Sequence, residues 1–525
     1  MQLFPIILPK QHICNESALY YRTNDPVEYN ETAGIITMHK NTILSLDTYF
    51  NCFSYSKYLQ YTYAAILEVH LKVQGDVQLR IMKAELQNSK IYRTEKLAQT
   101  VHHEQLEEIV LQYDFSSEQG KGFLYLEVKA LSQNVVIQFG YYSSPISAEQ
   151  INQTNLAAVI CTYKREEYVK RNLKHLTDTI FADKELQNHI EVLVIDNGKT
   201  LAKDDIEISG IKLYPNKNCG GSGGFTRGII EALNRKKEFS HVLLMDDDIL
   251  LESNVLVKTI HFLQVLRPEH ADLALGGSML RLDDMTVQHE AGGRWTGLTV
   301  DSRLSNIELR NIECLLQMEC NTENADFCGW WYCCIPLKII SETNLPLPLF
   351  IKIDDIEYGI RNTKKLLFLN GIGVWHEPFS KKENVLLHYY NVRNKLILNN
   401  IRGKDCGIGK TMFLFAYYLG KILLSDQYYK VIYPLKGFED YLKGPAWLNQ
   451  QDMEQLHQQL ILLNKQIDSQ NKKPRAYYFI VAGSAFLKNA ALLISKHKII
   501  VSEYQMQVPE LVSQKAWLKK LEIEV

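Results

Sequence analysis

The chain has 525 residues, of which 46% are hydrophobic and 22% are charged, and its formal net charge is -2 at pH 7. This length exceeds what one hydrophobic core supports, so about three domains are expected. The near-neutral charge gives no reason to expect a nucleic-acid partner. Ten cysteines without a CxxC pair indicate neither a disulfide framework nor a zinc site, and they favour a reducing cytoplasm.

The first 152 residues have the pattern of a β-sandwich domain. Residues 66–73 and 77–81 alternate between apolar and polar side chains, and Gln74, Gly75 and Asp76 between them predict a hairpin turn. Further strands are predicted at residues 109–115, 123–128 and 135–139. Short strands at this spacing are typical of a sandwich.

The pattern changes at about residue 153, where continuous apolar strands begin to alternate with helices. Residues 157–162 and 191–196 read as buried strands, and residues 165–177 between them carry Tyr168, Leu173 and Leu176 at helical spacing. This alternation predicts βαβ units and a parallel sheet.

Polar side chains follow these strands. Because parallel strands end at the same sheet edge, Thr162, Arg165 and Asp196 are expected to lie together. Asp196 has two interpretations, an acceptor for a nucleotide base or ribose, or a cap for the next helix.

The most informative stretch is the apolar strand that begins at His241 and ends in three aspartates, Asp246, Asp247 and Asp248. Carboxylates crowded at a strand end repel one another unless a cation lies between them, and a divalent metal is the usual cation. The alternative is an acidic turn that caps the helix expected near Ser253.

A glycine-rich stretch precedes this strand. Four of the five residues from Gly220 to Gly224 are glycine, and a helix is expected from about Thr226. Backbone amides there can approach an anion closely, and the helix dipole favours negative charge. A plain flexible loop explains the glycines equally well.

A second acidic cluster contains Asp354, Asp355 and Glu357. Its carboxylates can act as a general base, or they can stabilise the N-terminus of a helix.

Upstream, Trp330 and Trp331 are adjacent, so in a strand only one of them faces the core. The other is a candidate sugar-stacking residue, and packing of both is the alternative.

Helical periodicity dominates the chain after about residue 385. Arg393, in a predicted helix over 387–401, is a candidate contact for a diphosphate. Residues 476–487 are apolar, but the run is too short before Lys488 to span a bilayer. A buried helix is the default interpretation, and a peripheral membrane contact is the alternative, because basic residues flank the run.

Together these motifs resemble the family 2 glycosyltransferases of GT-A fold, and within them the bacterial galactofuranosyltransferases that build galactan. The motifs that carry the resemblance are residues 159–165, 218–225, 245–249, 329–332, 350–359 and 374–376. The resemblance implies an α/β GT-A transferase domain over residues 153–395, with an N-terminal β-sandwich over 1–152 and a C-terminal helical domain over 396–525.

The resemblance also implies roles for individual residues. Asp246, Asp248 and His376 would hold Mn²⁺ or Mg²⁺, and Asp355 would be the catalytic base, with Glu357 as the fallback. The implied nucleotide-sugar contacts are Thr162, Tyr163, Arg165, Asp196, Asn218, Gly220, Gly221 and Asp247, and the implied acceptor contacts are Trp330 and Trp331.

The implied donor is UDP-galactofuranose, and the implied acceptor is a cell-surface glycan or glycolipid. We expect a cytoplasmic enzyme with a peripheral contact on the inner membrane, and a homo-oligomer is left open. Two alternatives remain: a related transferase with another donor such as dTDP-rhamnose, and a non-catalytic scaffold that binds carbohydrate through the tyrosines of residues 48–63.

Overall fold

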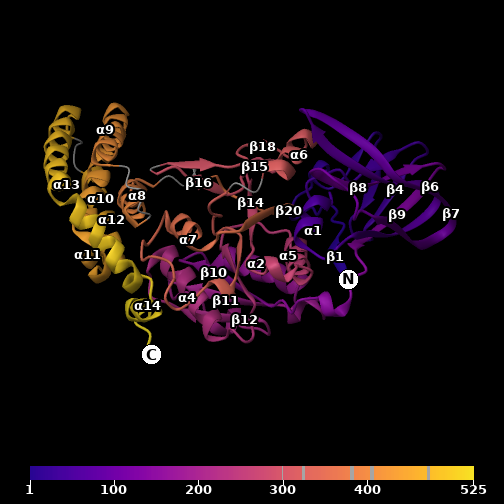
Figure 1. The fold of residues 1–525 in the computed structure, drawn as a ribbon, viewed down its shortest axis with the longest axis horizontal. Coiled ribbons are helices and arrows are strands. Elements are labelled where there is room, and N and C mark those ends of the chain that lie inside the picture. Colours follow the sequence, from indigo (N-terminus) through magenta and orange to yellow (C-terminus); the bar gives the residue numbers. More distant parts are fainter. Residues whose placement is uncertain (298, 322–324, 379–383, 402–406, 470–472, 525) are drawn as a thin grey trace.

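The computed structural model of the chain describes residues 1–297, 299–321, 325–378, 384–401, 407–469 and 473–524. Three regions follow one another along the long axis of the molecule (Figure 1). A β-sheet region lies at the N-terminal end, a mixed α/β region lies in the middle, and a group of helices lies at the opposite end.

The N-terminal region is an antiparallel β-structure built around one long hairpin. Strand β6 pairs with β7 along its whole length, while its other edge pairs first with β9 and then with β8. The sheet therefore divides into two layers that share the β6–β7 hairpin, as in a β-sandwich. The elements of this region are β1 (Gln2–Pro5), β2 (Arg22–Thr23), β3 (Glu28–Asn30), β4 (Ile35–Met38), β5 (Ile43–Ser45), α1 (Tyr55–Tyr61), β6 (Ile66–Gln87), β7 (Lys90–Asp114), β8 (Gly122–Ala130) and β9 (Val135–Ser143).

One prediction for this region is wrong. The chain does not turn at Gln74–Asp76, because β6 continues through these residues with a shift of register between Val73 and Gly75. The hairpin turn lies at Asn88 and Ser89, which both have positive φ, as a tight β-turn requires. Of the tyrosines in residues 48–63, Tyr49, Tyr55 and Tyr58 are fully buried, as expected of packing residues, whereas Tyr61 and Tyr63 are half-buried.

The central region contains a mixed sheet of nine strands. Its order is β12-β11-β10-β13-β19-β14-β15-β18, with β20 paired to β14. The predicted parallel arrangement is confirmed for β12, β11, β10 and β13, but β19 runs antiparallel to both of its neighbours. The nine strands are β10 (Leu156–Thr162), β11 (Ile190–Asp196), β12 (Ile211–Pro215), β13 (His241–Asp246), β14 (Ala274–Arg281), β15 (Val287–Glu290), β18 (Ile307–Glu308), β19 (Cys333–Pro336) and β20 (Leu366–His376). Strands β16 (Gly293–Trp295) and β17 (Val300–Ser302) form a separate two-stranded sheet.

The helices of the central region are α2 (Glu166–Thr179), α3 (Lys203–Ile206), α4 (Gly220–Asn234), α5 (Asn254–Gln264), α6 (Ile312–Asn321) and α7 (Asp354–Asn362). In α2 the buried face is formed by Val169, Leu173 and Leu176, whereas Tyr168 is exposed, contrary to the predicted face.

The glycine-rich stretch is the start of helix α4, so the predicted start near Thr226 is wrong. Glycine allows this helix to lie very close to strand β10. A Cβ added at Gly224 would be 2.1 Å from the Cys161 sulfur, and one added at Gly228 would be 2.2 Å from a Val159 methyl. These glycines therefore serve helix-to-sheet packing.

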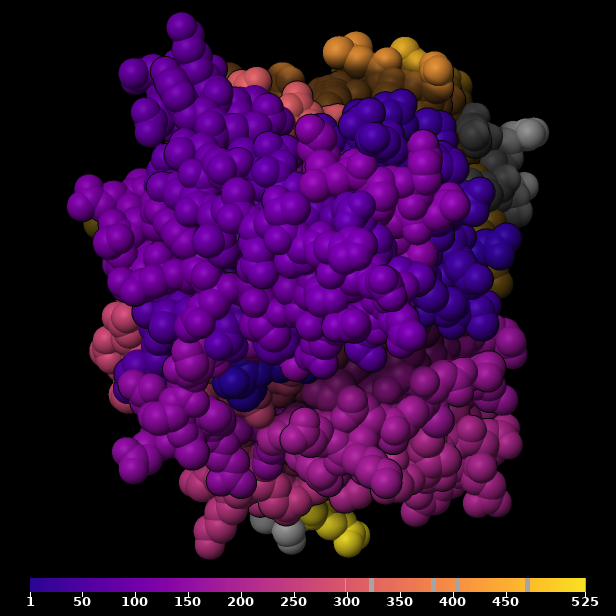
Figure 2. All heavy atoms as spheres, turned by 90° about the vertical axis from the view of Figure 1, so that its right-hand side faces the viewer, coloured from indigo at the N-terminus to yellow at the C-terminus, as the bar shows by residue number. Residues whose placement is uncertain are grey.

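The N-terminal region packs against the central region through a buried polar junction. The Lys57 ammonium lies 3.1 Å from Glu319 and donates to the Phe368 carbonyl at 3.0 Å, and Lys258 donates to the Asn370 carbonyl at 2.8 Å. In the view of Figure 2 the N-terminal residues cover the upper part of the molecule, above residues of the central region. These bonds satisfy the charges that the junction removes from water.

The C-terminal helices are α8 (Leu387–Ile401), α9 (Ile408–Leu424), α10 (Ile432–Tyr441), α11 (Gly444–Gln450), α12 (Met453–Ser469), α13 (Arg475–Leu511) and α14 (Gln514–Leu521). The apolar run 476–487 belongs to α13, which has 37 residues, so the predicted short helix is wrong. The predicted boundary at residues 395 and 396 falls inside α8.

The packing of α4 on β10 gives a testable prediction. Gly228→Ala should lower the free energy of unfolding by about 1–3 kcal/mol, because the new methyl overlaps Val159. The control is Gly483→Ala in α13, where an added Cβ meets nothing within 4 Å and should be neutral or stabilising by about 0.5–1 kcal/mol. Denaturant unfolding measures both, and equal midpoints for the two variants would contradict the packing account.

Candidate active site

The strand ends meet as the sequence predicts. In the parallel register Thr162 lies beside Asp196, and Cys161 lies beside Asp246. Strand β10 therefore places its carboxyl end between the ends of β11 and β13. This edge collects the polar side chains of three strands.

Asp246, Asp248 and His376 form a compact group of candidate metal ligands. One ligand atom from each lies within 4.8 Å of the others, and the His376 Nε2 atom is 3.2 Å from Asp248 and 3.7 Å from Asp246. Main-chain hydrogen bonds in both directions between Leu250 and Trp375 hold the aspartate loop against the end of β20. Two carboxylates and one imidazole suit Mn²⁺ or Mg²⁺.

Asp247 is buried and is bound by side chains from the end of β10 and the loop after it. Thr162 donates to it at 2.7 Å, and Arg165 donates to it at 3.2 Å. Burial raises the pKa of Asp247 to about 6, although the nearby Arg165 charge opposes this. Arg165 also donates to Asp248 at 2.7 Å, so its guanidinium neutralises part of the aspartate triplet.

Helix α2 fixes the backbone of this loop. Asn172 donates to the Asp247 carbonyl at 2.9 Å, and Arg171 donates to the Ile249 carbonyl at 2.7 Å. These bonds order the carbonyls that follow β13. The carboxylates therefore start from a fixed backbone.

A cavity of about 320 Å³ opens above this edge. Its lining includes most of the predicted nucleotide-sugar contacts: Thr162, Tyr163, Arg165, Asn218, Gly220, Gly221 and Asp247, together with Asp246. Asp196 does not line it, because its carboxylate accepts hydrogen bonds from the amides of Gly198, Thr200 and Leu201. Its predicted contact with the nucleotide stays a prediction.

The sequence analysis missed several residues of this cavity, namely Cys161, Asn197, Phe225, Phe350, Ile351 and His457. His457 comes from α12, more than 200 residues beyond the aspartates, and no local pattern marks it. Asn197 follows Asp196 directly, so its position at a strand end was the available signal.

The second acidic cluster lies beside the first turn of α4. Ser222 donates to Asp354 at 2.9 Å, and a Cβ on Gly221 would be 3.5 Å from the same carboxylate. Burial, strengthened by the Asp354 charge, raises the pKa of Asp355 to about 7. A carboxyl with such a pKa suits proton transfer near neutral pH.

Glu357 is engaged elsewhere. Glu357 is buried and accepts hydrogen bonds at 2.6 and 3.1 Å from Arg361, which lies one turn further along the same helix. This ion pair makes Glu357 a structural residue, so the geometry favours Asp355 over the fallback.

The segment that leads into Asp354 has an unusual backbone. Phe350, Lys352 and Ile353 have φ values of 75°, 67° and 72°, which non-glycine residues rarely adopt. Each such residue costs roughly 1–3 kcal/mol, so other contacts must hold the segment. Backbone strain of this kind is common where a side chain must be aimed.

Arg393 does not reach the cavity, contrary to the predicted diphosphate contact. It is fully buried and donates to the Leu349 carbonyl at 2.7 Å.

Trp330 and Trp331 are both buried: Trp330 packs against Phe225, and Trp331 donates to the Gly277 carbonyl at 2.8 Å. This is the packing alternative, and a contact with an acceptor stays a prediction.

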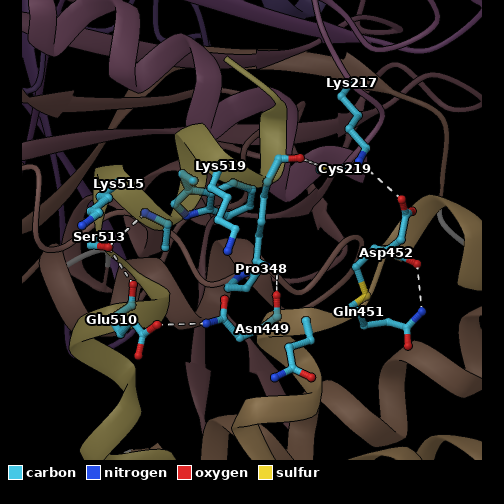
Figure 3. A pocket seen from close by; sticks show the side chains of 15 residues that line it. Lys217, Cys219, Pro348, Asn449, Gln451, Asp452, Glu510, Ser513, Lys515 and Lys519 are labelled. Atoms are coloured by element: carbon cyan, nitrogen blue, oxygen red, sulfur yellow. Dashed lines mark hydrogen bonds and ion pairs between the residues drawn. The ribbon is translucent and has the colours of Figure 1, made fainter. Parts of the chain in front are cut away.

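A larger cavity of about 680 Å³ lies beside the candidate site, where α14 meets α11 and α12 (Figure 3). Lys217 and Cys219 line it, whereas Asn218 and Gly220 line the cavity of about 320 Å³ above the sheet edge. Lys217 pairs with Asp452 and Glu522, and Lys520 donates to carbonyls at the end of α11. Lys217 thus ties the loop before α4 to residues at the start of α12 and the end of α14, and Lys520 ties α14 to α11.

Comparison with known proteins now gives the family. Residues 153–379 match the model described as "Glycosyltransferase like family 2". This segment is a family 2 glycosyltransferase domain. The candidate metal ligands and the second acidic cluster lie within this segment, as do all cavity residues except His457. The chain is a glycosyltransferase, and its mixed sheet is of the expected GT-A type.

The curated relatives are more specific. The chain is 26% identical to the galactofuranosyltransferase GlfT2 of Mycolicibacterium smegmatis over 455 residues, which cover 81% of this chain and 67% of that protein. It is also 26% identical to GlfT2 of Mycobacterium tuberculosis, over 77% of this chain and 65% of that protein. The chain spans about two thirds of the length of these relatives.

Solved structures give weaker likenesses. A mannosyltransferase from Pyrobaculum calidifontis in complex with GDP-Man and Mn²⁺ is 11% identical, with a TM-score of 0.32 over 66% of this chain and 89% of that chain. A CBM22-1 xylan-binding domain from Paenibacillus barcinonensis is 13% identical, with a TM-score of 0.18 over 24% of this chain and 87% of that one. Scores this low support no functional inference.

The ligand group predicts how the protein binds a metal. Asp248→Asn should weaken Mn²⁺ binding at least about tenfold, because it removes a charged ligand while keeping the side chain's size. Calorimetric titration with Mn²⁺ measures this. The control, Asp272→Asn, alters a surface carboxylate that pairs with Lys365 and should leave Mn²⁺ binding unchanged. Equal Mn²⁺ affinity in the Asp248 variant and the wild type would remove this group as the metal site.

Proposed function

We propose that the protein transfers galactofuranose from UDP-galactofuranose to a hydroxyl of a cell-surface glycan, with inversion at the anomeric carbon, in polysaccharide biosynthesis. One observation carries the proposal: two acidic clusters converge at the first turn of α4, in a chain that is 26% identical to galactofuranosyltransferases over 81% of its length.

The first cluster supplies the donor half of the site. Asp246, Asp248 and His376 would hold a divalent cation, which when bound neutralises the charge that develops on the departing diphosphate. Thr162 and Arg165 fix Asp247 beside them, and Arg165 brings a positive charge to the same cavity. These residues orient the donor and favour its diphosphate.

The second cluster supplies the acceptor half. Asp355 takes the proton from an acceptor hydroxyl, and that oxygen forms a bond to the anomeric carbon. The bond from the anomeric carbon to the diphosphate oxygen breaks, and its electron pair leaves with UDP. A single displacement of this kind inverts the anomeric centre.

The raised pKa of Asp355 fits this role. A base must be unprotonated to act, yet it must hold a proton well enough to remove one from a hydroxyl. Because the pKa of Asp355 is raised to about 7, it meets both needs near neutral pH. Glu357, paired with Arg361, lacks the freedom to do so.

A panel of nucleotide sugars tests the proposed donor. With Mn²⁺ and an acceptor that ends in galactofuranose, UDP-galactofuranose should release nucleotide much faster than UDP-galactopyranose or dTDP-rhamnose. Faster release from dTDP-rhamnose would identify the related transferase instead. If none of these sugars releases nucleotide, the proposed donor is wrong, while the family assignment stands.

The two acidic clusters should respond differently to mutation. Asp355→Asn keeps size and shape, so UDP affinity with Mn²⁺ should change little, while turnover falls by about two to four orders of magnitude. Asp248→Asn should weaken UDP affinity and turnover together, because it removes charge from the cation site. Calorimetric UDP titration with Mn²⁺ and transfer rates measure the two effects.

The pH dependence provides an internal control. Because the base acts without its proton, wild-type turnover should fall as pH drops below about 7, whereas Asp355→Asn should lose this dependence. Equal losses of UDP affinity in the two variants would place Asp355 in the cation site and contradict its role as the base.

We further propose that helices α9 and α13 contact an anionic membrane surface. Each carries a stripe of exposed apolar side chains at helical spacing, Phe413, Tyr417 and Leu424 on α9 and Ile480, Leu487 and Ile494 on α13, which are 65–73% exposed. Among the described residues, α13 is the helix whose length and composition suffice to cross a membrane.

The charges on these helices favour a lipid surface. Helix α9 and residues 475–502 of α13 contain no aspartate or glutamate, whereas Lys410, Lys421, Arg475, Lys488, Lys496 and Lys498 lie along them. Asp426, which follows α9, lies 4.0 Å from Arg475. Apolar stripes that carry basic and no acidic residues along their length match the headgroups of acidic lipids. A lipid-linked acceptor would lie on the same surface.

Vesicle binding tests this contact. The protein should bind vesicles that contain phosphatidylglycerol, less so as salt rises, because salt screens surface charge. The double variant Ile480→Asp and Leu487→Asp should lose binding, while Ile208→Asp, at an exposed apolar residue of the central region, should keep it. No vesicle binding at low salt would contradict the membrane contact. Self-association that the double variant abolishes would assign this surface to another copy of the chain instead.

A further inference from the structure

Helix α8 holds the strained segment before Asp354 from one side, in addition to the Ser222 contact from the central region. The Asn394 side-chain amide, on α8, donates to three backbone carbonyls of this segment: those of Leu349 at 3.2 Å, Ile351 at 3.0 Å and Lys352 at 2.8 Å. Asn394 is fully buried, so no water replaces these bonds.

A neighbouring arginine orients this amide. The Arg393 Nε atom donates to the Asn394 Oδ1 atom at 2.9 Å, which turns the Asn394 nitrogen toward the segment. Arg393 also donates to the Leu349 carbonyl, and its Nη1 atom donates to the Tyr389 hydroxyl, which donates in turn to Asp440. A buried network therefore fixes the direction of one amide.

The segment leads directly into the second acidic cluster. Ile353 is the N-cap of α7, its carbonyl accepts from Glu357, and Asp354 and Asp355 are the first residues of the helix. The Phe350 carbonyl accepts from Ser222, which also binds Asp354, and Phe350 and Ile351 line the cavity. A relaxed segment would change the direction of both carboxylates.

We infer that Asn394, oriented by Arg393, is a positioning residue for the transfer reaction. It holds the segment in which Phe350, Lys352 and Ile353 have positive φ, the conformation that directs Asp355 toward the acceptor hydroxyl. This inference rests on the proposed function, because it assumes that Asp355 is the base. It gives α8 a part in the chemistry, although α8 contributes no residue to the cavity lining.

Hydrogen exchange tests the contact apart from catalysis. Asn394→Ala, and the isosteric Asn394→Asp, should speed amide exchange in a peptide covering residues 349–357. The matched control is Asn400→Ala on the same helix, where a buried amide donates to the Tyr441 hydroxyl and not to the segment. Equal exchange in the Asn394 and Asn400 variants would overturn the inference.

Turnover tests the positioning role. With saturating donor, Asn394→Ala should lower kcat about 10- to 100-fold, since small misplacement of a catalytic group has such effects. Asn400→Ala should lower it less than about threefold.

Relief of strain separates positioning from general stability. Glycine adopts positive φ without strain, so Lys352→Gly should make the segment depend less on Asn394. Asn394→Ala should therefore lose less kcat in a Lys352→Gly background than in a Lys352→Ala background, which removes the same charge but keeps the strain. Equal losses in the two backgrounds would overturn the inference. If no donor supports transfer, the proposed function fails, while the exchange result still decides whether Asn394 holds the segment.

Discussion

Three carboxylates crowd one edge of the central sheet, and their repulsion determines which groups must surround them. Asp246, Asp247 and Asp248 follow one strand, and their mutual repulsion must be offset by positive charge. Arg165 supplies part of that charge from the end of the neighbouring strand, and β20 brings His376 to the same place. A cation site is the arrangement that uses these groups together, and a nucleotide diphosphate is a ligand that such a site can recognise.

The C-terminal helices complete this site from outside the transferase domain. Helix α12 adds His457 to the cavity, α14 anchors the loop before α4, and α8 holds the segment that leads into Asp354. Contacts from three helices mean that the acidic clusters depend on residues far along the chain. If α9 and α13 lie on a membrane as proposed, the same helices place the catalytic site near lipid-linked acceptors.

Much of this arrangement is predictable from sequence because local rules govern it. Apolar strands that end in polar residues located Thr162, Asp246 and their neighbours, since parallel strands share one edge. Other features follow from tertiary contacts that local patterns do not record. The glycines before Phe225 form a helix because they must pack closely on β10, and α13 extends far beyond its most apolar segment. His457 and Asn394 act across long sequence separations, so periodicity does not reveal them.

The proposal that Asp246, Asp248 and His376 bind the metal of the donor site is best tested by a crystal structure with UDP and Mn²⁺, in which the anomalous signal of manganese is measured. The account predicts one manganese peak bound by Asp246, Asp248 and His376, with the UDP diphosphate on the same ion and the nucleoside in the cavity beside Thr162 and Arg165. Asp355 should face the vacant sugar position. A manganese peak at another group of residues, or UDP bound away from this sheet edge, would contradict the account.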